Sequence, residues 1–411
     1  MSDQPEHVVI VGAGLGGLRT AQQLRSAGYQ GRISLVGAER HAPYDRPPLS
    51  KQLLTGEWDA ERTVLAGPDT VEELGVRLHL GLPAVALRPG DGGHELELAD
   101  GSALRGDAVV IATGLTARAL PDQPAAVHTL RTLDDALALR AALADAGSLL
   151  VVGAGFIGAE VASAARGRGL DVTVLEALPA PSARALGPEL GTLTGRLLTE
   201  AGVDLRTSAT TTGFADVPAG VAVELTGGGR VVADVAVVGI GGTPRLDWLD
   251  GTATGAGSDG AGLHCGPDGR VHGLHAVWAV GDVAAWDDPV HGDRHRHEHW
   301  TSATDQAAVV ARDIVGAAPP PRAVPYFWSD QFGLKIQVLG RPELADGLAP
   351  LHGNGLEDGP VRGTVAAYTA GDRVVAVAGF GAARLVARYR PLVAANAELA
   401  QARETAAALG G

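Results

Sequence analysis

Two glycine-rich segments, far apart in the chain, carry the glycine spacing that binds dinucleotides. In this spacing the first glycine allows a tight turn, the second lets the backbone approach a pyrophosphate, and the third lets a helix pack closely on a strand. The free N–H groups at the start of the helix then face the phosphate oxygens. The glycines are Gly12, Gly14 and Gly17 in the first segment, and Gly153, Gly155 and Gly158 in the second.

An acidic residue follows each motif at the place where a bound nucleotide would present its ribose hydroxyl groups. Glu39 ends the strand expected after the first motif, and Glu176 ends the strand expected after the second. A carboxylate there accepts hydrogen bonds from the ribose hydroxyls and repels a 2′-phosphate. No arginine lies directly beside Glu176, although Arg184 follows a little later. The second site is therefore expected to prefer NADH over NADPH.

Each motif lies between an expected strand and an expected helix. Residues 7–28 begin with an apolar strand, turn at the glycines and continue with apolar residues at helical spacing, and the next strand follows at 32–39. Residues 148–177 repeat this βαβ pattern, which indicates an internal duplication of a dinucleotide-binding fold. Further buried strands are predicted at 107–114, 234–244 and 274–286.

A change of pattern near residue 320 predicts a third domain. Residues 316–325 are rich in proline and alanine, as is typical of a linker. Strand-like segments follow, and then a terminal helix that is interrupted near Pro391. We expect an α/β chain with two Rossmann-like domains and a C-terminal α+β domain. The expected limits are 1–114 with 245–322 for the discontinuous first domain, 115–244 for the second and 325–411 for the third.

Composition and charge restrict the class of protein. Hydrophobic residues make up 45% of the chain and charged residues 19%, which is typical of a globular protein with sizeable cores. The net charge of −14 disfavours nucleic acid as a partner, whereas the charge-balanced residues 325–411 would repel an acidic protein least. No apolar segment is long enough to span a membrane, and the polar start of the chain predicts a cytoplasmic location.

One cysteine, Cys265, is present in the whole chain. A single cysteine excludes an intramolecular disulfide and a site that needs several cysteine ligands, such as an iron–sulfur cluster. We expect Cys265 to be a small apolar residue without a catalytic role.

Two dinucleotide sites in one chain indicate one tightly held cofactor and one that exchanges. This arrangement resembles the two-dinucleotide flavoprotein reductases, which bind FAD at the first site and NAD(H) at the second. Their third element, a Gly-Asp pair that ends a strand, is matched by Gly281 and Asp282. Disulfide reductases and peroxide-reducing members use cysteine after the second strand. Residues 41–54 contain none, so no thiol there can accept electrons from a flavin.

Six segments spread along the chain carry a more specific resemblance. The most specific are RHEHWTSATDQA (296–307) and PYFWSDQFGLKIQVLG (325–340). The others are PYDRPPLSK (43–51), LRTLDDA (130–136), VVGAGFIGAEVA (151–162) and AVGDVA (279–284). Through these segments the chain resembles, over essentially its whole length, the FAD-dependent ferredoxin reductases, which serve haem monooxygenases and Rieske-type oxygenases and to which rubredoxin reductases are related. It departs from the usual pattern at Arg245, where Asn is common, and at Cys265, where Asp is common.

The resemblance implies roles for residues around the FAD. Glu39 would hold the adenosine ribose, and Val85 would lie near the adenine through its backbone. Arg131 would lie near the phosphates, and Asp282 would hold the ribityl chain. The other FAD-binding positions are Arg46, Ala112, Thr113, Gly114 and Gly281.

The catalytic residues implied by the resemblance are Lys51, Glu160 and Trp300. Lys51 and Trp300 would lie beside the isoalloxazine ring, and Glu160 would meet the nicotinamide end of NADH. A cation beside the ring favours the electron-rich reduced flavin, and a partly buried cation needs a partner, for which Glu160 is the candidate. Glu176 would hold the NADH ribose. The other NADH-binding positions are Gly153, Gly155, Ile157, Gly158, Arg184 and Gly241.

The two prolines before Lys51 predict the local backbone. Each proline biases the residue before it towards extended geometry, so Arg46 and Pro47 are expected in an extended segment. Pro48 would then start a short helix that ends at Gly56, with Lys51 in its first turn.

We therefore expect a flavoprotein reductase that takes hydride from NADH onto FAD and passes single electrons to a ferredoxin, which feeds a haem monooxygenase or a Rieske-type oxygenase. Two alternatives stay open, namely an NADH oxidase without a protein acceptor and a flavin-binding redox-sensing or scaffold protein. A monomer or weak dimer is expected. The matching motif of the resembling reductases holds no metal, so we expect none at the histidines His291, His295, His297 and His299.

Overall fold

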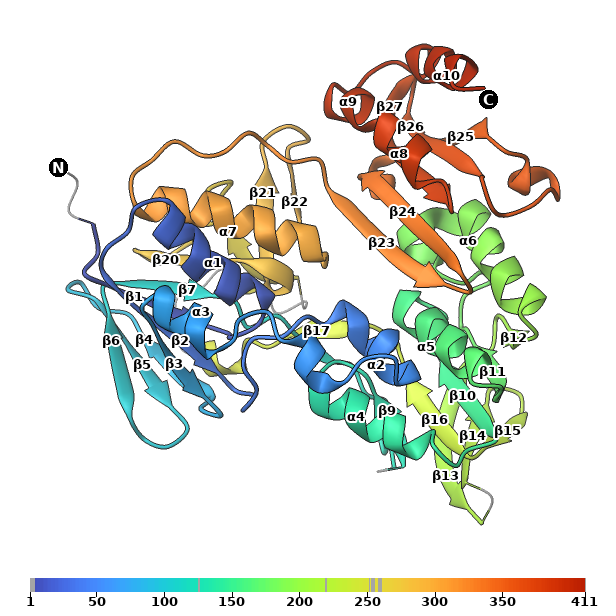
Figure 1. Ribbon diagram of the computed structural model, residues 1–411, viewed down its shortest axis with the longest axis horizontal. Helices are drawn as coiled ribbons and strands as arrows, with labels where there is room; N and C mark the ends of the chain where they lie inside the picture. Colours follow the sequence, from blue (N-terminus) through green and yellow to red (C-terminus); the bar gives the residue numbers. More distant parts are fainter. Residues whose placement is uncertain are drawn as a thin grey trace. The chain divides into compact units, whose positions relative to one another are not determined.

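The computed structural model describes residues 4–124, 126–218, 220–250, 252, 256–257 and 261–410. The chain forms two compact units, each built from segments that are far apart in the sequence (Figure 1). The first unit comprises Met1–Asp45, Glu61–Thr116 and Gly242–Ala323. The second unit comprises Arg46–Ala60, Ala117–Gly241 and Val324–Gly411.

A five-stranded parallel sheet with the order β20-β7-β1-β2-β3 forms the centre of the first unit. Side chains alternate along a strand, so Val8 and Ile10 contribute to the core on one face, and Val9 and Val11 to the core on the other. Both faces are covered, which explains the uninterrupted apolar sequence of the strand. The strands are β1 (His7–Val11), β2 (Arg32–Gly37), β3 (Val76–Leu80), β7 (Ala108–Ile111) and β20 (Val277–Ala279).

Two helices, α1 (Leu15–Ser26) and α7 (Trp300–Ile314), pack together on one face of this sheet through residues such as Ala21 and Val310 (Figure 1). The core on the other face includes Leu87 from a three-stranded antiparallel sheet. The remaining elements of the unit are η2 (Ala60–Thr63), α3 (Pro68–Glu73), β4 (Ala84–Arg88), β5 (His94–Leu98), β6 (Ala103–Gly106), β8 (Leu115–Ala117), β17 (Gly242–Pro244), η3 (Asp247–Leu249), β18 (Ala256–Gly257), β19 (Gly262–Cys265), η4 (Gly281–Val283), β21 (Ala284–Asp288) and β22 (Asp293–His295).

The second unit contains another five-stranded parallel sheet, with the order β12-β11-β10-β16-β9. Its core includes Val151 of β10 and Val161 of α5. The strands are β9 (Val127–Thr129), β10 (Ser148–Val152), β11 (Asp171–Leu175), β12 (Asp204–Arg206) and β16 (Val235–Val238). The other elements are η1 (Pro47–Ser50), α2 (Gln52–Thr55), α4 (Leu133–Ala142), α5 (Phe156–Gly167), α6 (Ala183–Glu200), β13 (Thr211–Val217), β14 (Gly220–Leu225) and β15 (Arg230–Ala233).

An antiparallel sheet with the order β23-β24-β27-β26-β25 completes the second unit. Residues of α6 such as Leu190 and Leu193 share a core with Ile336 and Phe380 of this sheet. The sheet therefore packs on the second parallel-sheet domain within one unit. Its elements are β23 (Tyr326–Gln331), β24 (Leu334–Gly340), η5 (Pro342–Leu344), β25 (Gly347–His352), η6 (Gly355–Glu357), β26 (Val365–Ala370), β27 (Arg373–Phe380), α8 (Ala383–Arg388), α9 (Arg390–Ala394) and α10 (Leu399–Ala408).

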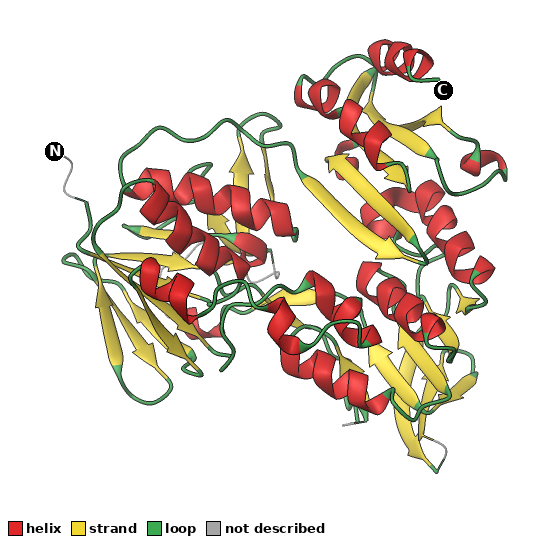
Figure 2. Ribbon diagram, viewed as in Figure 1, coloured by secondary structure: helices red, strands yellow, loops and turns green. Residues whose placement is uncertain are grey.

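These elements confirm the predicted fold class, which was two Rossmann-like domains and a C-terminal α+β domain (Figure 2). The limits given above for the three domains stay a prediction. The described residues include no helix that is both long and apolar enough to cross a membrane.

The local prediction for the segment before Lys51 was wrong in two respects. Arg46 is helical rather than extended, with φ −85° and ψ −33°, and its carbonyl accepts a hydrogen bond from Leu49 N at 2.9 Å. This bond closes a 3₁₀ turn and outweighs the bias imposed by the following proline. The helix then breaks at Lys51, whose φ of −124° and ψ of −105° separate η1 from α2. Gly56 ends α2 in the left-handed conformation, as predicted.

The terminal helix is interrupted near Pro391, as predicted, because a proline fits the first turn of α9 but not the interior of a longer helix. A second break, which was not predicted, separates α9 from α10. The histidines His295, His297 and His299 do not share a strand, since β22 ends at His295. Their rings still lie near one another, with 4.3 Å between the centroids of His295 and His297 and 5.9 Å between those of His297 and His299. In the described part of the chain no group of three or more His, Cys, Asp or Glu could hold a metal.

Candidate functional site

The first glycine turn joins β1 to α1, and its three glycines differ in what surrounds them. Gly12 has a φ of +118°, and a Cβ there would lie 2.2 Å from Ala112 O. A Cβ on Gly17 would lie 1.9 Å from Gly12 O. By contrast, no atom lies within 4 Å of the Cβ position of Gly14. The chain's own packing thus requires the first and third glycines, whereas the second leaves open the space that a phosphate would use.

The second glycine turn, between β10 and α5, repeats this arrangement. Gly153 has a φ of +102°, and a Cβ there would lie 2.5 Å from Gly239 O. A Cβ on Gly158 would lie 2.0 Å from Gly153 O, and the space beside Gly155 is again open to 4 Å. Neither α1 nor α5 has a side-chain cap, so the N–H groups of both first turns can bind phosphate oxygens. Both turns therefore fit a dinucleotide.

The turns that follow β1, β7 and β20 meet at one edge of the first sheet, because neighbouring parallel strands end on the same side. Gly281 has a φ of +75°, and its N–H donates to Gln306 Oε1 of α7 at 2.7 Å. This bond fixes the turn that carries Asp282. The predicted FAD-binding residues at this edge are Gly12, Gly14, Ala112, Thr113, Gly114, Gly281 and Asp282.

Two aromatic side chains of the first unit are oriented by carboxylates. Tyr44 OH donates to Glu39 Oε2 at 2.6 Å, which holds the carboxylate expected to bind the FAD ribose. Trp300, the first residue of α7, donates from Nε1 to Asp45 Oδ1 at 2.8 Å. The guanidinium carbon of Arg19 lies 5.7 Å from the Trp300 ring centroid. These contacts fix the plane of the ring expected beside the flavin.

Val85, expected near the adenine, lies on β4 and is exposed.

Glu176 holds the second glycine turn directly. Its Oε2 accepts a hydrogen bond from Ala154 N at 2.8 Å, and its Oε1 accepts one from Leu178 N at 2.8 Å. Each carboxylate oxygen keeps a further lone pair for a ribose hydroxyl. Arg184 is exposed near the start of α6, and Gly241 follows β16 with a φ of +98°. Ile157, in the first turn of α5, is an exposed apolar residue.

Arg131, expected near the FAD phosphates, and Arg46, another expected FAD-binding residue, are joined in the second unit by a hydrogen bond from Arg46 Nη1 to Arg131 O. Arg131 N donates in turn to Asp135 Oδ2 at 2.9 Å. Asp135 also forms a capping box with Thr132 at the start of α4. The backbone at Arg131 is therefore held by the helix cap, and Arg46 is anchored on it.

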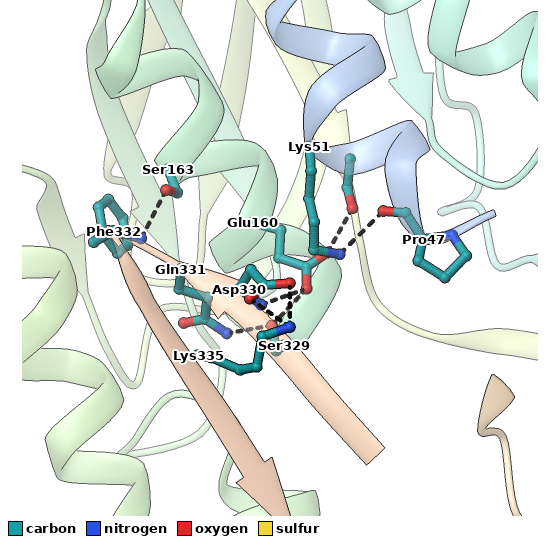
Figure 3. Close-up of polar contacts among 10 residues, drawn as sticks. Pro47, Lys51, Glu160, Ser163, Ser329, Asp330, Gln331, Phe332 and Lys335 are labelled. Carbon is teal, nitrogen blue, oxygen red and sulfur yellow. Dashed lines mark hydrogen bonds and ion pairs between the residues drawn. The ribbon is translucent and has the colours of Figure 1, made fainter. Parts of the chain in front are cut away.

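The expected pairing of Lys51 with Glu160 is present. Lys51 Nζ lies 2.7 Å from Glu160 Oε2, and 14% of the Lys51 side chain but only 3% of the Glu160 side chain is exposed (Figure 3). Lys51 Nζ also donates to Pro47 O at 3.1 Å. The break in the helix at Lys51 lets the ammonium group contact both the carbonyl one turn earlier and the carboxylate on α5.

Glu160 has three further hydrogen-bond donors. Ser50 Oγ donates to Oε2 at 2.5 Å. Ser329 Oγ donates to Oε1, also at 2.5 Å (Figure 3). Asp330 N also donates to Oε1, at the longer distance of 3.3 Å. A buried carboxylate is stable only with a counter-ion and enough donors, and this one has both. The fixed carboxylate of Glu160 can therefore hold the Lys51 ammonium in one position, and no mobile counter-ion is needed.

The sequence did not predict the residues that orient the expected site residues. Ser50 precedes Lys51, and Ser329 lies in the segment WSDQF, so both lie within segments that sequence analysis singled out. Nothing in the spacing says that these two hydroxyls meet on Glu160. Gln306 and Asp45 are similar cases, since each contacts a partner that is distant in the sequence.

Cys265 is fully buried, and burial raises the pKa of its thiol well above the ordinary value. Its Sγ lies 3.3 Å from Leu263 O of the same strand. The thiol is therefore part of the core of the first unit and is not a nucleophile in the native protein.

The chain matches two known protein families, one after the other along the sequence. Residues 6–307 match the pyridine nucleotide-disulphide oxidoreductase family, and residues 326–409 match the reductase C-terminal family. Rhodocoxin reductase of Rhodococcus erythropolis is 38% identical over 82% of this chain and 79% of its own length. The ferredoxin–NAD(+) reductase component of the p-cumate 2,3-dioxygenase system of Pseudomonas putida is 36% identical over 83% of this chain and 82% of its own.

Among solved structures, the reductase in the covalent putidaredoxin reductase–putidaredoxin complex superposes with a TM-score of 0.88. It is 32% identical, and the match covers 94% of this chain and 93% of that one. The resemblance to ferredoxin reductases found in the sequence is thus confirmed. The chain belongs to the pyridine nucleotide-disulphide oxidoreductase family, and within it to the group of ferredoxin reductases that carry the reductase C-terminal domain.

Proposed function

We propose that this chain is an NADH-dependent ferredoxin reductase with FAD at the first glycine turn and NADH at the second. The electrons pass to an iron–sulfur ferredoxin that feeds a haem monooxygenase or a Rieske-type oxygenase. The similarity to reductase components of this kind along nearly the whole chain supports the proposal. The two open glycine turns supply the matching sites. We further propose the three domains in the limits given above, and a cytoplasmic location.

The observation that carries the proposal is the buried Lys51–Glu160 pair on a chain without a reactive thiol. Thiol-dependent chemistry needs an accessible cysteine, and Cys265 is buried in the first unit. In place of a thiol, residues 46–60 present a lysine whose ammonium is fixed by a carboxylate and a carbonyl. A fixed cation suits the stabilisation of a reduced flavin rather than disulfide exchange.

FAD, when bound, supplies a hydride acceptor for NADH and a source of single electrons for an iron–sulfur protein. The residues of the chain bind and orient. Gly14 and Gly155 let the backbone approach the two pyrophosphates, and Glu176 selects a ribose without a 2′-phosphate. With FAD bound, Lys51, held by Glu160, would supply a positive charge beside the ring, where electron density increases on reduction. No side chain has to transfer a proton in this step.

The test is reduction of cytochrome c by NADH, with and without an added ferredoxin. A ferredoxin reductase shows strong stimulation by ferredoxin, low oxygen consumption without it, and a flavin spectrum that bleaches on addition of NADH. Rapid oxygen consumption that ferredoxin does not change would instead identify an NADH oxidase. Tight flavin binding with negligible turnover under both conditions would favour the redox-sensing or scaffold protein.

A further inference from the structure

The carboxylate of Glu160 is shared between two segments that approach it from opposite ends of the sequence. Ser50 and Lys51, which precede it by more than 100 positions, both contact Oε2. Ser329, which follows it by 169 positions, contacts Oε1. Glu160 lies in the region that matches the oxidoreductase family, and Ser329 lies in the region that matches the reductase C-terminal family. The hydrogen bonding of Oε1 therefore depends on the C-terminal domain.

The direction of the Ser329 hydroxyl is fixed by its neighbour. Gln331 Nε2 donates to Ser329 Oγ at 2.9 Å, so the hydroxyl hydrogen of Ser329 remains for Glu160 Oε1 (Figure 3). The two residues are two positions apart on β23 and therefore face the same side. Ser329 is fully buried and Gln331 is 1% exposed, so water does not replace either contact. The result is an ordered chain of donors that ends on the carboxylate.

Without Ser329, the bonding of Oε1 would be poor. The remaining donor to this oxygen is Asp330 N, at 3.3 Å. A buried carboxylate that loses a short, charge-assisted bond rotates towards other donors to recover the loss. This rotation weakens the contact of Oε2 with Lys51 Nζ, because the two oxygens belong to one rigid group. The position of the lysine cation thus depends on a serine of the C-terminal domain.

We propose that Ser329 is a positioning residue for the reductase reaction, and that through it the C-terminal domain holds Glu160 in the geometry that fixes Lys51. This inference rests on the proposed function, in which Lys51 and Glu160 act where the nicotinamide meets the flavin. It assigns the C-terminal domain a part in the reduction of the flavin, in addition to any contact with a protein partner.

The chain offers a matched control for a merely structural effect. Ser163, one turn after Glu160 on α5, accepts a hydrogen bond at Oγ from Phe332 N at 2.8 Å (Figure 3). Phe332 and Gly333 form the two-residue turn between β23 and β24, with φ of +48° and +72°. Ser163 therefore anchors the same hairpin to the same helix as Ser329 does, but it does so through a backbone N–H of the turn and not through the carboxylate.

The experiment measures flavin reduction by NADH in a stopped-flow instrument for the wild type, Ser329→Ala, Ser329→Thr, Ser163→Ala, Glu160→Gln and the double variant Ser329→Ala/Glu160→Gln. The limiting rate at saturating NADH should fall at least fivefold in Ser329→Ala, with a dissociation constant for NADH within twofold of the wild type. Ser329→Thr keeps the hydroxyl and should recover most of the rate. Ser163→Ala should reduce at the wild-type rate.

The double variant tests whether Ser329 acts through Glu160. Ser329→Ala should slow a protein that already carries Glu160→Gln by less than twofold, because the ionised acceptor is gone. A second readout is independent of turnover. Ser329→Ala should lower the thermal unfolding midpoint more in the wild-type background than in the Glu160→Gln background, since charged acceptors form the stronger bonds.

The outcomes distinguish a failure of the inference about Ser329 from a failure of the proposed function. If Glu160→Gln slows reduction but Ser329→Ala does not, the inference fails and the proposed function stands. Equal and additive losses in Ser329→Ala and Ser163→Ala would also overturn it, because the hairpin anchor alone would then explain the effect. If NADH does not reduce the flavin of the wild type, the proposed function fails and the inference fails with it.

Discussion

Removal of the Lys51 ammonium should lower both the stability of the second unit and the rate of flavin reduction. In Lys51→Met, the buried Glu160 carboxylate loses its counter-ion but keeps Ser50 Oγ, Ser329 Oγ and Asp330 N as donors. Removing one partner of a buried pair costs about 3–5 kcal/mol. Because three donors remain and Lys51 is itself 14% exposed, we expect about 2–3 kcal/mol.

That loss corresponds to a fall of roughly 5–10 °C in the unfolding midpoint, at roughly 2–4 °C per kcal/mol for a unit of a few hundred residues. The rate of flavin reduction by NADH should fall at least tenfold, which equals about 1.4 kcal/mol in the activation free energy. Both FAD content and the midpoint are measured on the same sample, so that a loss of rate is not confused with a loss of flavin.

Lys335 is the matched control, since it is the other lysine of the chain. Its Nζ lies 3.1 Å from Asp330 Oδ1, but both side chains are about 40% exposed, with 43% for Lys335 and 39% for Asp330. Exposed pairs contribute about 0–1 kcal/mol, so Lys335→Met should change the midpoint by no more than roughly 4 °C.

The double variant Lys51→Met/Glu160→Gln separates the two effects. Removing both charges takes away the unpaired carboxylate, so the midpoint should return most of the way to that of the wild type. The rate should stay low, because the double variant still lacks the Lys51 cation that we propose to act beside the flavin. Wild-type values of both rate and midpoint in Lys51→Met would refute the reasoning, since the carboxylate would then not need the lysine and the reaction would not need its charge.

The other predictions concern the nucleotide preference, the acid stability and the thiol. Glu176→Ala should lower the ratio of kcat/KM for NADH to kcat/KM for NADPH, and an unchanged ratio counts against Glu176 as the discriminating group. The substitution should also loosen the turn at Ala154, whose N–H donates to the carboxylate. Burial alone would raise the pKa of Asp288, but hydrogen bonds from Arg322 and other donors hold it well below the ordinary value. Its stabilising effect is therefore complete at neutral pH and is lost progressively as the pH falls from about 4 towards the depressed native pKa, so Asp288→Asn should lower the unfolding midpoint more at pH 7 than at pH 3; an equal difference at both pH values would contradict this. Cys265 should not react with a thiol reagent in the native protein but should react after denaturation, and labelling at native conditions would show that its strand is exposed.

The local sequence was sufficient to predict the structure at positions where backbone geometry alone decides it. Gly12 and Gly153 could be placed because a positive φ and a carbonyl too close for a Cβ leave no other residue for these turns. The parallel strands could be placed because both faces of the sheet are covered, which makes their apolar segments uninterrupted. The roles of the predicted site residues stay predictions, and the experiments above test the most important of them.

Local sequence failed where a hydrogen bond outweighed a propensity. The proline after Arg46 favours an extended backbone, but the bond from Leu49 N closed a turn there instead. The short helix expected through Lys51 broke at that residue, and the same break brings the ammonium group to Glu160. A rule based on neighbouring residues contains no information about an acceptor that lies more than 100 positions away.

By itself, the sequence determined two dinucleotide-binding units, a third domain of another type, and a lysine in the segment where thiol-dependent members of the fold carry cysteine. Glycine spacing and apolar periodicity are properties of short segments, and the count of cysteines is a property of the composition. All three can therefore be interpreted without knowledge of the packing. Only the tertiary structure decided that Ser50, Lys51 and Ser329 meet on one buried carboxylate. The physical reason is that a charge removed from water takes its donors from whatever segments the packing brings within about 3 Å, and their separation along the chain does not enter that requirement.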